Sequence, residues 1–172
     1  MRFVPTFVYS MKEISNESSV LVGKRHSAVS LILIVQIVFT IGLIAVGWFY
    51  TASSDHAISE QSLSTLRIGV IFLAITSFVL RRMLFRWDRL KNTAILKGIP
   101  GLLSSLTSNA IILGAMAQTI AIIGFLIAAL GGVKTEMFTF GAVALILFLV
   151  NFPRRGIWLK IVGNLEKSLE DF

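Results

Sequence analysis

The chain has 172 residues, of which 55% are hydrophobic and 15% charged, and its formal net charge is +7. Soluble domains average about 45–50% apolar residues, and the excess here is gathered in long runs that leave little chain for a separate soluble domain. The absence of cysteine excludes disulfides, thiol catalysis and thiolate metal sites. Because the basic residues flank the apolar runs and form no single patch, we expect anionic lipid headgroups as their partners, and no nucleic acid.

The first apolar run begins after a mixed, polar N-terminal segment, residues 1–26. A helix that crosses a bilayer needs roughly 20 mostly apolar residues. Residues 27–50 meet this requirement without a single charge, hold one large polar side chain, Gln36, and end in the aromatic sequence Trp48-Phe-Tyr. Aromatic residues are typical of membrane–water interfaces, so this run predicts the first span.

A polar loop leads to the second predicted span, about residues 66–85, which has arginines at both of its ends. The connection that follows contains the helix breakers Gly98, Pro100 and Gly101. This pattern predicts a turn between the second and third spans.

The third span is predicted over about residues 109–130, where Gly131 and Gly132 end it. The next loop is only a few residues long, so the fourth span, about residues 137–152, should form an antiparallel hairpin with the third. Pro153 cannot continue a helix and terminates it.

The tail, residues 156–172, has the periodicity of an amphipathic helix. Its apolar residues share one helical face: Trp158, Ile161, Val162, Leu165, Leu169 and Phe172. The simplest interpretation is a helix that lies on the cytoplasmic membrane surface. A helix that binds a partner protein is the alternative.

Lysine and arginine are distributed unevenly among these segments. The N-terminal segment, the connection between the second and third spans, and the tail hold four, six and four of them, whereas each of the other two loops holds one. Cytoplasmic loops are enriched in these residues. We therefore predict a multi-pass protein of a cell inner membrane with both termini in the cytoplasm.

Small residues form a continuous stripe along the third span, at alternating spacings of three and four. They are Gly114, Ala117, Ala121, Gly124, Ala128 and Gly131. In lipid, small residues allow close helix packing, so the stripe predicts a contact face. The contact is either with neighbouring helices of the same chain or with another subunit of a homo-oligomer.

Gln118 lies beside this stripe, near the middle of the third span. An unsatisfied polar group in an apolar medium is costly, so the amide should have a partner. Candidates are Gln36 on the first span, Thr76 and Ser77 on the second, and the adjacent Thr119. The arrangement predicts an interhelical hydrogen bond; a polar relay or an ion ligand is the alternative.

No motif indicates an enzyme, a cofactor or a metal site. The sequence has no phosphate-binding glycine loop, hydrolase elbow or metal-ligand spacing. Asp55, His56 and Glu60 lie close together in the predicted outer loop. We interpret them as solvated loop residues; a metal site is the alternative. The spans also lack ionisable residues near their centres, which proton relays commonly use.

Residues 110–155 resemble a group of small uncharacterised bacterial four-span membrane proteins. The resemblance rests on the run Gly114–Leu130 and on the sequence Asn151-Phe-Pro-Arg-Arg after the fourth span. It implies a four-span fold in a bacterial inner membrane. The third span is also similar to the ion-carrying helix of rotary ATPase c-subunit proteolipids, but Gln118 stands where that family has its ion-binding glutamate, so proton translocation is not implied.

The sequence therefore predicts an all-α transmembrane four-helix bundle, residues 27–155, with a C-terminal interfacial helix. The leading functional hypothesis is a non-enzymatic protein that acts by helix packing, as a homo-oligomer or as an accessory subunit of another membrane protein. The alternative is a small channel or transporter with a polar path near Gln36 and Gln118.

Overall fold

The computed structural model describes residues 16–50 and 59–170, and every element in this part of the chain is a helix. The helices are α1 (Asn16–Tyr50), α2 (Glu60–Leu84), α3 (Trp87–Gly131), α4 (Lys134–Asn151) and α5 (Arg155–Glu170). Four helical stretches are long and apolar enough to cross a membrane. The prediction of an all-α chain with four such helices is confirmed.

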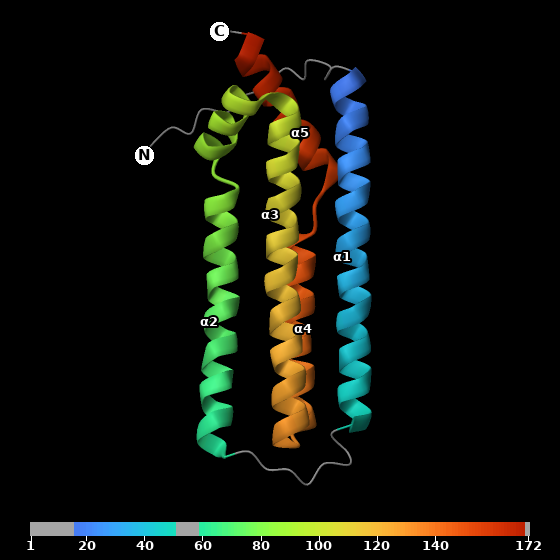
Figure 1. The fold of residues 1–172 in the computed structure, drawn as a ribbon, viewed down its shortest axis with the longest axis vertical. Coiled ribbons are helices and arrows are strands. Elements are labelled where there is room, and N and C mark those ends of the chain that lie inside the picture. The colour runs from blue at the N-terminus through green and yellow to red at the C-terminus, as the bar shows by residue number, and fades with distance from the viewer. Residues whose placement is uncertain (1–15, 51–58, 171–172) are drawn as a thin grey trace, which may run out of the picture.

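The long helices alternate in direction, so that α1 and α3 run one way and α2 and α4 the other (Figure 1). α3 and α4 pack as an antiparallel hairpin, α1 and α2 both contact this hairpin, and α1 makes no close contact with α2. In the most apolar stretch of α3, 44% of the residues are buried, against 17% in α1 and in α2. α3 is therefore the central helix of the bundle.

The two ends of the bundle differ in charge. One end of the bundle holds the start of α1, the end of α2 and the helix α5 (Figure 1). This end includes Arg81, Arg82 and Arg154. At the other end, where α2 and α4 begin, Arg67 and Lys134 are the cations among the described residues. We call these the basic end and the opposite end.

The helix boundaries follow local chemistry. Gly98 breaks α3 with φ 66° and ψ −174°, a conformation that is essentially restricted to glycine. Gly132 caps α3 in the left-handed region and donates its N–H to the Ala128 carbonyl at 3.0 Å. α4 stops at Asn151, because the residue before Pro153 is held extended. The ends predicted at Gly132 and before Pro153 are confirmed, and Gly98 breaks the helix as predicted. Pro100 and Gly101, predicted as breakers beside it, lie inside α3, and the connection between α2 and α3 falls at residues 85–86.

All four long helices begin before their predicted spans, and α1 and α3 differ most. α1 begins at Asn16 and not near residue 27, and α3 is already helical after its break at Gly98, about ten residues before the predicted span. At 1.5 Å per residue, 35 residues reach about 52 Å, well beyond a hydrocarbon core of about 30 Å. The boundary predicted at residues 26 and 27 thus falls inside a continuous helix.

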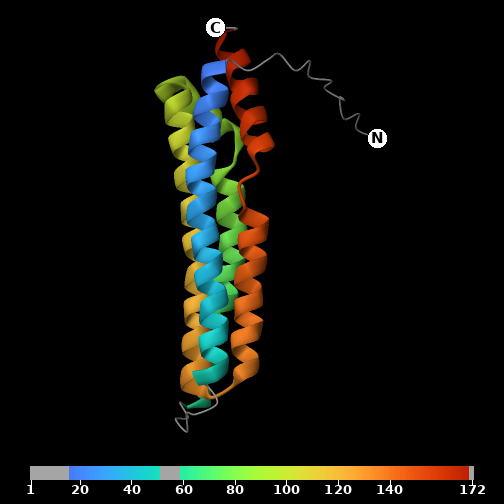
Figure 2. The ribbon, with the colours of Figure 1, turned by 90° about the vertical axis from the view of Figure 1, so that its right-hand side faces the viewer.

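α5 differs from its prediction as a helix on the membrane surface. It continues along the bundle axis beyond α4 (Figure 2) and packs against α1 and α3 at the basic end. Trp158, Val162 and Leu165 are buried there, at 2%, 0% and 1% exposure. The apolar face of α5 was predicted to contact lipid. In the structure, the extensions of α1 and α3 cover this face instead. Leu169 and Phe172, predicted on the same face, have side chains outside the described part.

Polar contacts fix α5 to α1. His26 Nε2 on α1 donates to the Pro153 carbonyl at 2.9 Å, and the His26 ring meets the Trp158 ring edge-on at 5.8 Å between centroids. Nearer the start of α1, the Ser18 hydroxyl donates to the Glu166 carboxylate. α5 is therefore joined to the bundle along much of its length.

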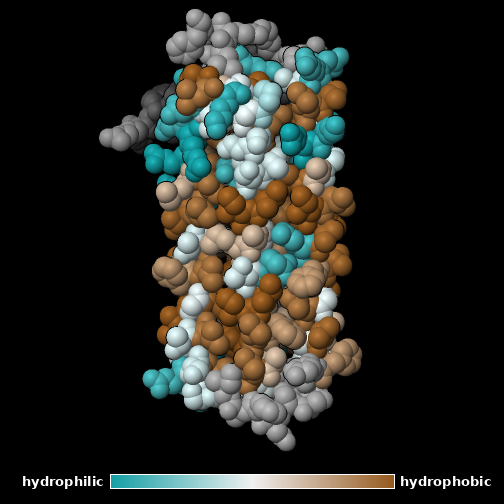
Figure 3. Space-filling view, in the orientation of Figure 1, coloured by the Kyte–Doolittle hydropathy of each residue, from teal (hydrophilic) through white to brown (hydrophobic). Residues whose placement is uncertain are grey.

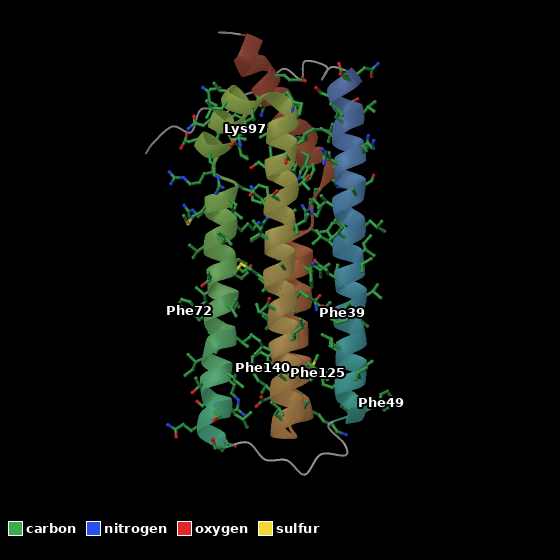
Figure 4. The ribbon with its side chains drawn as sticks, viewed as in Figure 1. Phe39, Phe49, Phe72, Lys97, Phe125 and Phe140 are labelled. Atoms are coloured by element: carbon green, nitrogen blue, oxygen red, sulfur yellow. The ribbon has the colours of Figure 1, made fainter. Side chains whose placement is uncertain are left out.

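A wide apolar band crosses the face of the molecule shown in Figure 3, below the basic end. Phe49 and Phe72 lie on the outer sides of α1 and α2 (Figure 4), with 74% and 71% of their surface exposed, whereas Phe140 is buried. Large exposed apolar patches of this kind are rare on soluble monomers. The band agrees with the four helical stretches that are long and apolar enough to cross a membrane.

Candidate functional site

The small-residue stripe of α3 faces the chain's own helices. At Gly114, an added Cβ would lie 2.6 Å from Gln36 Oε1 and would also collide with Leu33. Both neighbours are the ends of flexible α1 side chains, so the glycine leaves room for Leu33 and Gln36 against α3.

Further along the stripe the neighbour changes. A Cβ at Gly124 would lie 2.5 Å from Phe140 Cβ on α4, and a Cβ at Gly131 would lie 3.1 Å from the side chain of Leu63 on α2. The remaining members of the stripe, Ala117, Ala121 and Ala128, are fully buried. One stripe thus serves three neighbours within the chain, and its buried part is not open to a second subunit.

Gln118 finds a partner that the sequence analysis did not name. The Thr40 hydroxyl on α1 donates to Gln118 Oε1 at 3.2 Å, and Thr40 is completely buried. Thr40 lies four residues after Gln36, so both face α3 from one side of α1. That spacing is the signal by which Thr40 could have been found. Thr119, one of the candidates, donates to the Ala115 carbonyl of its own helix at 2.9 Å.

The hydrogen bonding of this site is incomplete. Two of its side-chain atoms, both buried, lack a partner among the described residues: Gln36 Oε1, an acceptor, and Gln118 Nε2, a donor. Both side chains are only half-buried, and Figure 3 shows a hydrophilic patch inside the apolar band between α3 and α1. We call Gln36, Thr40 and Gln118 the amide site. Of the three, Gln36 and Gln118 are partly exposed and place polar side chains on this face.

Thr76 and Ser77 are not part of the amide site. They lie on α2, which contacts α3 and α4 but not α1. Ser77 is fully buried, and its hydroxyl has no partner among the described residues. The structure therefore separates the four predicted polar residues into two places, with α3 between them, and does not join them into one path.

An ion pair joins α2 to α4 at the opposite end. Arg67 Nε donates to Glu136 Oε1 at 2.8 Å, its terminal Nη2 contacts the same oxygen, and Glu60 lies 3.8 Å from Nη1. The Glu136 side chain is 14% exposed and that of Glu60 is 88% exposed. The pair therefore connects the helices through Glu136, with Glu60 as a peripheral charge.

No group of histidine, cysteine, aspartate or glutamate side chains able to hold a metal occurs among the residues that the structure describes. Glu60 is exposed at the start of α2, and the other two members of the loop cluster, Asp55 and His56, lie outside the described residues.

Comparison with known proteins does not assign the chain to a family. Comparison of the chain with protein families, with curated proteins and with solved structures finds no match. The resemblance of residues 110–155 to four-span proteins and to c-subunit proteolipids therefore stays a prediction.

Proposed function

We propose that this chain is a non-enzymatic, multi-pass protein of a bacterial inner membrane that acts by pairing with a second transmembrane protein through its amide site. The supporting observation is the pair of partly exposed glutamine side chains on a face of the apolar band. In hydrocarbon, an exposed polar group without a hydrogen bond is costly, and a neighbouring helix can supply a partner for it.

A second copy of this chain is the simplest partner. An amide is both a donor and an acceptor, so a face that presents Gln36 and Gln118 is complementary to itself. Two-fold symmetric dimers are the commonest homo-oligomers because one patch then serves both subunits. The buried small-residue stripe is used inside the chain, and the dimer proposed here rests on the amides instead.

The proposed orientation places the basic end in the cytoplasm, which the enrichment of lysine and arginine at that end supports. Reporters that work only in the cytoplasm or only in the periplasm, fused near Asn92 and after the C-terminus, test it. Both fusions should report the cytoplasm. Periplasmic activity of either fusion would reject the orientation.

Association is tested by single-molecule photobleaching or FRET in lipid vesicles over a range of protein-to-lipid ratios. Gln36→Met keeps the size of the side chain and removes its donor and acceptor. In a two-fold dimer each substitution removes two interhelical hydrogen bonds, worth about 0.6 kcal/mol each. The dissociation constant of the dimer should therefore rise about eightfold.

Thr119→Val is the matched control, because its hydroxyl is satisfied by the Ala115 carbonyl of the same helix. This variant should associate like the wild type. Wild-type association of both Gln36→Met and Gln118→Met, or a wild-type protein that stays monomeric at the highest density, would reject the amide site as an interface.

A further inference from the structure

A cavity of about 290 Å³ lies where α2, α3, α4 and α5 meet at the basic end. It is bounded by Arg81 near the end of α2, Asn151 at the end of α4, and Arg154 just before α5. Trp87 and Trp158 also line it. Since α2 and α4 both stop here, the cavity lies at the border between the apolar band and the polar basic end.

The cavity has a positive charge that nothing on its walls neutralises. Arg81 lies on α2 and Arg154 in the link between α4 and α5, and neither makes an ion pair within the described part of the chain. No aspartate or glutamate lines the cavity. Two guanidinium groups at one cavity repel each other unless an anion lies between them, and the guanidinium group matches the geometry of phosphate.

Two further features suit an anion at the same place. The buried Asn151 Oδ1 has no partner among the described residues, and rotation of the amide would present its N–H₂ group to a ligand oxygen. α5 begins directly after Arg154 with no acidic residue in its first turn, although the positive end of a helix dipole favours negative charge. These features reinforce the charge of the two arginines.

The rest of the wall is apolar and includes Phe85, Ile157 and Ile161. A ligand at this border should therefore have a phosphate for the arginines and an apolar part for these side chains. Basic pockets between transmembrane helices on the cytoplasmic side suit anionic lipid headgroups.

We propose that this cavity binds the phosphate group of an anionic glycerophospholipid, held between Arg81 and Arg154. The inference rests on the membrane insertion proposed above and is independent of pairing through the amide site. It goes beyond general attraction of lipid to surface charge, because it assigns the preference to two of the arginines at the basic end.

Tryptophan fluorescence gives a direct test. The chain has three tryptophans; Trp87 and Trp158 line the cavity, whereas Trp48 lies near the opposite end of α1. In a Trp48→Phe background, purified protein in mild non-ionic detergent is titrated with brominated phosphatidylglycerol or brominated phosphatidylcholine, whose bromines quench nearby tryptophan. Half-maximal quenching should need about tenfold less phosphatidylglycerol, whereas equal requirements for the two lipids would overturn the proposal.

Neighbouring arginines provide a control of equal charge. The pair Arg81→Gln and Arg154→Gln should lower the preference for phosphatidylglycerol to about twofold or less. The pair Arg82→Gln and Arg155→Gln removes the same charge outside the cavity wall and should leave it near tenfold. If both double variants lost the preference for phosphatidylglycerol equally, general surface charge would explain it, and the proposed binding site would be rejected.

A soluble phosphate ester is the other source of the same chemistry. Glycerol 1-phosphate at millimolar concentration should not displace the brominated lipid, because it lacks the apolar part. Displacement that is lost in the Arg81 and Arg154 double variant would assign the cavity to a soluble ligand and overturn the lipid proposal. Gln36→Met should keep the lipid preference, which separates this test from that of the amide site.

Discussion

A methyl group at Gly124 would test the packing between α3 and α4. In Gly124→Ala the new Cβ would lie 2.5 Å from Phe140 Cβ, about 0.9 Å closer than the 3.4 Å at which ordinary contact begins. Both atoms are bonded directly to the backbone, so side-chain rotation cannot relieve the clash and the two helices must separate. Overpacking of this kind costs about 1–3 kcal/mol.

The helix propensity of alanine works in the other direction and offsets up to about 1 kcal/mol. The net expectation is therefore a loss of about 1–2 kcal/mol in the free energy of unfolding. It is measured by titrating the protein from mild detergent into dodecyl sulfate and following helix content by circular dichroism.

Gly69→Ala is the matched control, because an added Cβ at that helical position meets no atom within 4 Å. It should be neutral or stabilising by up to about 1 kcal/mol. A Gly124→Ala protein as stable as Gly69→Ala would refute the close approach of α3 and α4 at this level. Truncation by Phe140→Ala should not rescue Gly124→Ala, because the clashing Cβ remains.

Three further substitutions test other parts of the fold by thermal or detergent unfolding. Trp158→Ala should cost about 3–5 kcal/mol, because this side chain of α5 is buried against the bundle, whereas Trp87→Ala, at a residue that is 42% exposed, should cost far less; equal losses would contradict the docking of α5. Gly98→Ala should cost about 1–3 kcal/mol for its backbone conformation, and a neutral result would argue against the break in α3. Glu136→Gln should lower the melting temperature more than Glu60→Gln, since only Glu136 is well shielded in the ion pair with α2, and the reverse order would assign the contact to Glu60.

The position of the helix breaks could be read from local chemistry. Gly98, Gly132 and Pro153 act through the backbone conformations that they allow or forbid, and these need no knowledge of distant residues. The number of apolar helices is equally local, because it depends on the length of each uncharged run.

The partners of the predicted site could not be read in the same way. None of the polar candidates named for Gln118 is its partner. The partner is Thr40, because α1 places this hydroxyl against α3. Likewise the glycines of the stripe face three different helices. Which helix lies against which depends on the packing of the whole bundle. The periodicity of a single helix does not contain this information.

The tail shows the same limit most clearly. Its periodicity correctly placed Trp158, Val162 and Leu165 on one face, but only the tertiary structure showed that protein covers this face. Hydropathy measures the preference of a side chain for leaving water, and lipid and protein interior satisfy that preference equally well. The sequence alone therefore determined which segments are helical and which faces are apolar, and the tertiary structure decided what each face contacts.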